Sequence, residues 1–164
     1  MGYTHYWYRP EELDATTWAR FTDATRTILD VAAVELGSGD GTRTPEVGAG
    51  RVVFNGRPPN DYEPFSIDRA YCKYRGEAPD VSLHYFNFCK TGHRDYDLVV
   101  VAVLVAFKLA FGASVRVLSD GHPSEWSPGL AVAERVLGKL TVGWNKDNGE
   151  LLSVASAAET AGVA

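Results

Sequence analysis

The richest group of chemically capable side chains in this sequence lies between residues 86 and 97, in the stretch FNFCKTGHRDYD. It holds a cysteine, a lysine, a threonine, a histidine, an arginine and two aspartates. Such side chains can form a nucleophile with its base, a metal site, or a binding site for an anion where a helix begins. Each possibility requires a different spacing, so the surrounding elements decide among them.

A catalytic cysteine needs a base within hydrogen-bond reach and a lowered thiol pKa. Cys89 and His93 are four residues apart, as on a helix, but the alternation before Thr91 is that of a strand. The two side chains would then meet only through a sharp turn at Gly92. On the strand, Cys89 shares a face with Tyr85, which favours a buried packing role. We therefore predict no catalytic residue in this stretch.

The histidines give no metal-binding pattern. They lie at His5, His84, His93 and His122 and form no H-x-H, H-x-x-x-H or H-E-x-x-H spacing. The sequence therefore predicts neither a metal ion nor another cofactor. The spacing leaves open whether His5, Cys89, His93 and Asp97 converge in the folded chain.

An anion site makes fewer demands on spacing. Lys90, Thr91 and Arg94 lie just before an expected helix start at Asp95 to Asp97. The free N–H groups and the positive dipole end of a helix favour phosphate at such a place. The two aspartates are also good caps, and caps would occupy the same N–H groups. Capping alone and anion binding both remain open.

The N-terminal strand offers a second half of such a site. Alternation over residues 2–9 places His5, Trp7 and Arg9 on one face and Tyr6 on the other. An aromatic ring can stack on a base and an arginine can hold phosphate, although aromatic residues also pack in cores. The candidate ligand-binding residues are therefore His5, Tyr6, Trp7, Arg9, Lys90, Thr91, Arg94 and Asp97, and the strand-end residues Asn55, Ser119, Asp120 and Trp126 carry less weight.

These residues must be positioned by a mixture of strands and helices. The patterns predict strands at 2–9, 51–56, 65–74, 82–91 and 114–121, and helices at 15–36, 97–111 and 127–140. The order β-α-β-β-β-α-β-α predicts one α+β domain over residues 1–150, with an antiparallel-rich sheet packed by helices. Residues 151–164 are expected to form a marginal helix or a disordered tail. The glycine-rich segment 37–50 lacks phosphate-loop and dinucleotide-binding spacing and reads as a solvated loop.

Charge, cysteine content and hydropathy indicate which binding partners and which cellular compartment to expect for this protein. The formal net charge of −5 disfavours binding to long nucleic acid. The two cysteines form no C-x-x-C pair and the first residues lack an apolar signal region, which predicts a reducing cytoplasm. The apolar run 98–107 is about half the length that spans a bilayer, so we expect it in a core or at a subunit interface rather than in a membrane.

The motifs GYTHYW (2–7), FCKT…YD (88–97) and SDG (119–121) resemble those of an uncharacterised family of short bacterial and phage proteins. The family turn commonly reads ARKPYD where this chain has GHRDYD, so Asp95 replaces a proline and changes the local charge. Phage proteins of this size that answer host nucleotide signals often sequester the messenger, which gives an analogy at the level of protein class.

The leading expectation is a homo-oligomeric binding module that sequesters a small nucleotide-derived anion, such as a cyclic nucleotide or cyclic ADP-ribose, in phage counter-defence. One alternative is a phosphodiester hydrolase with His5 and His93 as acid and base. Another is a protein-interaction module that uses the aromatic strand and the apolar helix as its contact surface.

Overall fold

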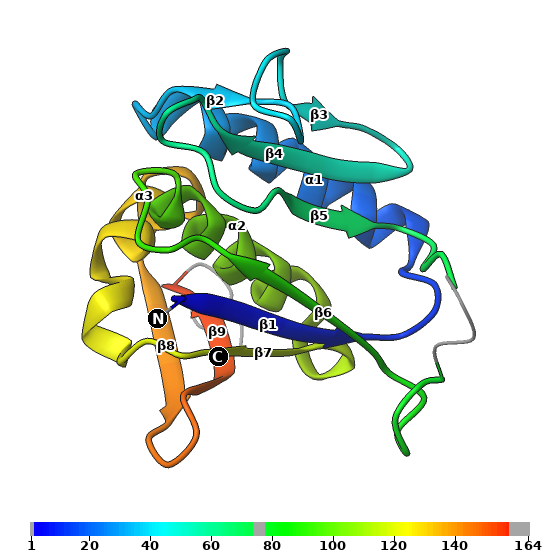
Figure 1. The fold of residues 1–164 in the computed structure, drawn as a ribbon. Coiled ribbons are helices and arrows are strands. Elements are labelled where there is room, and N and C mark those ends of the chain that lie inside the picture. Colours follow the sequence, from blue (N-terminus) through cyan, green and yellow to red (C-terminus); the bar gives the residue numbers. More distant parts are fainter. Residues whose placement is uncertain (1, 74–77, 158–164) are drawn as a thin grey trace.

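The main sheet is antiparallel and contains both ends of the described chain. The computed structural model describes residues 2–73 and 78–157. Five strands pair in the order β6-β1-β7-β9-β8. Their bounds are Thr4–Arg9 (β1), Tyr85–Lys90 (β6), Arg116–Ser119 (β7), Leu140–Asn145 (β8) and Glu150–Ser156 (β9). The predicted α+β class is confirmed, and β1 lies between β6 and β7 (Figure 1).

A smaller sheet lies above the main sheet in the view of Figure 1. Its central strand β4 (Arg51–Gly56) pairs with β2 (Leu36–Gly37), β3 (Glu46–Val47) and β5 (Phe65–Asp68), all antiparallel. The alternation of Val52 and Phe54 puts their side chains into the core, where Phe54 contacts Phe65. The two sheets therefore enclose one common hydrophobic core.

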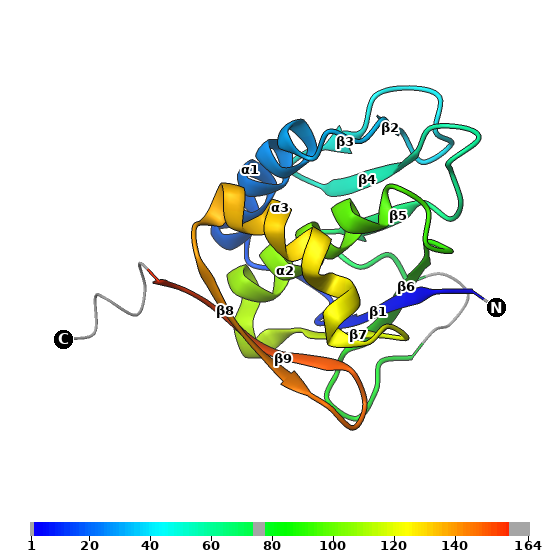
Figure 2. The same ribbon diagram turned by 90° about the vertical axis from the view of Figure 1, so that its left-hand side faces the viewer.

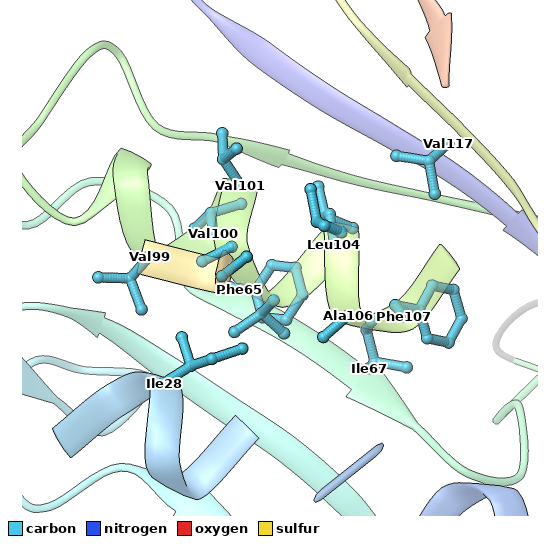
Figure 3. Packing of buried hydrophobic residues seen from close by; sticks show 14 of the residues in the cluster. Ile28, Phe65, Ile67, Val99, Val100, Val101, Leu104, Ala106, Phe107 and Val117 are labelled. Carbon is cyan, nitrogen blue, oxygen red and sulfur yellow. The ribbon is translucent and has the colours of Figure 1, made fainter. Parts of the chain in front are cut away.

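Helix α2 (Asp97–Phe111) fills the space between the sheets. Its side chains from Val99 to Phe107 are all buried. Figure 3 shows several of them packed with residues of α1, β5 and β7, namely Ile28, Phe65, Ile67 and Val117. Within the described residues, α2 with the turn after it is the one helix apolar and long enough to cross a membrane, but here protein surrounds it. Because the side chains from Val99 to Phe107 are buried in the core of this chain, they are not available for the subunit interface that the sequence also allowed for this segment.

The other two helices pack against α2. Asp14 caps α1 (Ala15–Val31), as its sequence position predicts, by accepting a hydrogen bond of 2.8 Å from the Thr17 amide. Helix α3 (Ser127–Leu137) approaches α2 closely because Gly129 has no side chain at the crossing, where a Cβ atom would collide with Val101. Helices α1, α2 and α3 lie on one side of the main sheet (Figures 1 and 2).

Several elements differ from the predicted ones. Helix α1 ends at Val31 rather than at residue 36, and the glycine-rich loop contains the short strands β2 and β3. Residues 151–156, expected in a marginal helix or disordered tail, form β9, which pairs with β7 and β8. The small side chains there give little intrinsic preference for a strand, and β9 is stabilised by its pairing with β7 and β8. The predicted strand 65–74 is described only to residue 73 and ends at Asp68, and tail residues 158–164 lie outside the described residues.

Arg9 joins the two sheets at the end of β1. Its side chain is 1% exposed. The guanidinium donates to the carbonyl oxygens of Pro10 (2.8 Å), Glu11 (2.9 Å) and Arg69 (2.8 Å) and to that of Asp68. Burial lowers the pKa of Arg9 to about 10, while the Asp68 carboxylate opposes that shift. The bonds to the last residue of β5 and to the residue after it tie the two sheets together, so Arg9 acts as a structural clamp.

Candidate functional site

Three of the predicted site residues meet beneath the main sheet. The Nε2 atom of His5 lies 2.8 Å from Oδ1 of Asp97, and the Thr91 hydroxyl donates to the same oxygen. His5 comes from β1, Thr91 from the turn after β6, and Asp97 from the first residue of α2. Asp97 therefore uses its carboxylate to hold these elements together, and Tyr96 before it makes no side-chain cap.

Aromatic rings enclose this cluster. His5 is fully buried and makes edge contacts with Tyr3 (centroids 5.0 Å apart) and Trp126 (5.4 Å). His93 stacks on Tyr3 at 3.9 Å instead of approaching Cys89. Burial, with a smaller contribution from the Asp97 carboxylate, raises the pKa of Tyr3 to about 12. A ligand in solvent cannot touch His5 while these rings stay in place.

Cys89 is a packing residue in the structure. It is fully buried, and its Sγ atom lies 3.5 Å from the Glu63 carbonyl oxygen. Burial raises the thiol pKa far above its ordinary value, and the nearby Glu63 carboxylate adds to the shift. The described residues contain no group of three His, Cys, Asp or Glu side chains arranged to hold a metal ion.

The other predicted residues point to different places. Trp7 is fully buried beside Phe65, and Arg9 is held by backbone carbonyls, so neither faces a shared pocket with Lys90. Arg94 is exposed on the turn before α2. Tyr6 and Lys90 lie on the solvent side of the main sheet, opposite His5. The predicted set is therefore divided between the core, the buried cluster and an outer surface.

That outer surface carries four aromatic side chains, Tyr6, Tyr8, Phe86 and Phe88, which we call the aromatic face. Phe86 contacts Tyr6 (centroids 6.0 Å apart), Tyr8 (5.2 Å) and Phe88 (5.8 Å). Phe86 remains 45% exposed and Phe88 48% exposed. The largest apolar patch on a typical soluble monomer covers about 300–600 Å² and is often functional, so this connected set of rings is a candidate interaction site.

Charged groups of both signs border the aromatic face. Lys90 Nζ lies 5.9 Å from the centre of the Phe88 ring, and the Arg116 guanidinium 5.3 Å from that of Tyr8. Arg116 is also bound by both carboxylate oxygens of Glu150, at 2.9 and 3.1 Å. Asp120 accepts a hydrogen bond of 2.8 Å from the Tyr6 hydroxyl, which fixes that ring. Lys90 is the less constrained of the two cations, because its nearest carboxylate, that of Glu63, lies 3.9 Å away.

No protein-family model, curated protein or solved structure matches this chain.

Sequence reasoning missed Phe86 and Phe88 as surface residues. The signal was present, because alternation places both with Lys90 on one face and Cys89 on the other. The sequence interpretation considered Cys89 and its neighbours on the buried face of β6, and left Phe86 and Phe88 on the opposite face unassigned. The register across the sheet, with Tyr6 opposite Phe88 and Tyr8 opposite Phe86, then assembles the aromatic face from two distant segments.

Proposed function

We propose that this protein is a binding module that captures a small, planar, nucleotide-derived anion on its aromatic face. The observation that carries this proposal is the connected set of exposed rings with a cation beside it. Each base stacked on an aromatic side chain contributes about 1–3 kcal/mol. Lys90 supplies an ammonium group for phosphate beside Phe88, the most exposed ring of the face. The His5–Asp97–Thr91 cluster positions β1 and β6 from below.

The geometry favours holding the ligand over hydrolysing it. An acid and a base must both reach the reacting atoms. His5 is fully buried with its Nε2 atom against Asp97, and the His93 ring stacks on Tyr3. Neither histidine lies on the aromatic face. Sequestration of a cyclic nucleotide or cyclic ADP-ribose, as in phage counter-defence, is the form of this proposal that fits the sequence resemblance.

Calorimetry with cyclic AMP, cyclic GMP and cyclic ADP-ribose tests the proposal. We expect heat from at least one of them, and Phe88→Ala should weaken that binding about tenfold or more. Val81→Ala is the control, because Val81 is an exposed apolar residue that is not one of the four rings of the face. Mass spectrometry after denaturation should recover the ligand unchanged. Absence of heat from every compound would refute nucleotide binding, and a changed ligand mass would favour the hydrolase.

A further inference from the structure

The aromatic face covers only one side of a stacked ligand. Small-molecule sites usually bury about 70–90% of the ligand surface. In Figures 1 and 2, the helices lie on the opposite side of the main sheet, and no described element covers the outer side. The remaining exposure of Phe86 and Phe88 agrees with that arrangement. If the face binds a nucleotide, as proposed above, the described chain provides one wall and lacks the second.

The charges that flank β1 suit a second copy of the same chain. Lys90 pairs with Thr4 on the β6 side of β1, whereas the Asp120 amide donates to the Thr4 carbonyl oxygen from the β7 side. A two-fold axis parallel to β1 would turn one face onto the other. It would bring Lys90 of each copy opposite Asp120 of the other, as an isologous interface requires. Long nucleic acid would instead require a predominantly basic face.

The size of the face explains why the ligand is needed. The face and its bordering charges lie on three strands, β6, β1 and β7, which at a spacing of about 4.8 Å and a length of at most six residues cover roughly 15 Å by 20 Å, or about 300 Å². Each partner of a stable pair usually buries about 800 Å². Contact between the sheets alone is therefore expected to be weak, and a base stacked between the two faces adds the missing contacts.

We propose that two copies of this chain close their aromatic faces around the ligand, so that the bound state is a pair of chains. The test is sedimentation velocity of the full chain, alone and with the compound from the calorimetric panel that gives the largest heat. We expect a single-chain mass alone and a doubled mass with ligand, at one ligand per two chains. The variant Asp120→Lys places like charges opposite each other and should weaken pairing at least tenfold. Asp120→Asn keeps an acceptor for Tyr6 but removes the charge opposite Lys90, so it should weaken pairing less than Asp120→Lys does.

The outcomes separate this proposal from the binding function on which it rests. Ligand binding without a change of mass would overturn the pair and leave the binding function intact. A doubled mass that Asp120→Lys leaves unchanged would place the interface elsewhere and also overturn the pair. No heat with any compound and a single-chain mass throughout would overturn both. Ligand-dependent doubling that is lost in Asp120→Lys would support both.

Discussion

The Nε2 atom of His5 lies 2.8 Å from Oδ1 of Asp97, although 92 residues separate the two in the chain. His5 is fully buried, and the Asp97 side chain is 16% exposed. The bond joins β1, an inner strand of the main sheet, to the first turn of the buried helix. Because Thr91 donates to the same oxygen, one carboxylate fixes β1, the turn after β6 and the start of α2.

Removing that carboxylate should destabilise the fold. Asp97→Ala leaves the His5 ring and the Thr91 hydroxyl without their partner, and we expect a loss of about 2–4 kcal/mol in unfolding free energy. Asp97→Asn keeps one acceptor oxygen and should lose about half as much. Urea denaturation measures both, with Asp95→Ala, an exposed neighbour, as control. Equal stability of Asp97→Ala and the control would contradict the structural role of the cluster.

Replacement of Arg9 by lysine should destabilise the fold. An ammonium group has three donors, whereas the guanidinium reaches four carbonyl oxygens at once. We expect Arg9→Lys to lower the unfolding free energy by about 3 kcal/mol or more, because buried acceptors are left unpaired. Arg20→Lys, at an exposed position on α1, should change it by less than ~0.5 kcal/mol. A similar small change in both variants would show that Arg9 is not a clamp.

The sequence predicted the elements whose signals are local. The Asp14 cap, the apolar run of α2 and the strand 51–56 occur where the patterns placed them. Strand β9 was missed because Ser153, Ala155 and Ser156 have low intrinsic strand preference. Its pairing with β7 and β8 depends on residues far away in the chain, which periodicity does not report.

The candidate site was harder to predict because each strand has two faces. The sequence placed His5 and Trp7 on the face opposite Tyr6, but it could not say which face α2 would cover. The spacing left open whether His5 and Asp97 converge, and the structure joins them. Arg9 shares the His5 face, yet its position at the strand end directs it to backbone carbonyls. Long-range packing, rather than residue type, decided which side chains lie on the solvent-exposed surface.

Tyr3 should make stability fall at alkaline pH. Burial raises its pKa from 10.0 to about 12 in the folded chain. Between these values the unfolded chain has lost the phenolic proton and the folded chain retains it, so stability is complete below pH ~10 and decreases toward pH ~12. Tyr3→Phe removes this contribution and should flatten the decrease in urea titrations across that range. Parallel curves for the wild type and Tyr3→Phe would refute the assignment.

The two thiols should differ sharply in reactivity. Cys72 is exposed, whereas Cys89 is buried and its pKa is raised by burial. Because the thiolate is the reactive form, one thiol should react rapidly with Ellman's reagent in the native protein and two should react in urea. Cys72→Ser should abolish the rapid phase. If Cys72→Ser retained a rapid phase, Cys89 would be accessible, and its assignment as a packing residue would fail.

The aromatic face should contribute little to stability if it serves binding. Phe88 is 48% exposed, so Phe88→Ser should lower the unfolding free energy by less than about 1 kcal/mol. Leu104→Ala, in the fully buried centre of α2, should cost about 2–5 kcal/mol in the same urea experiment. Binding of an apolar dye should decrease in Phe88→Ser, because the exposed patch becomes smaller. If Phe88→Ser lowered the unfolding free energy as much as Leu104→Ala does, the Phe88 ring would be a structural residue. That result would contradict a binding role for the aromatic face.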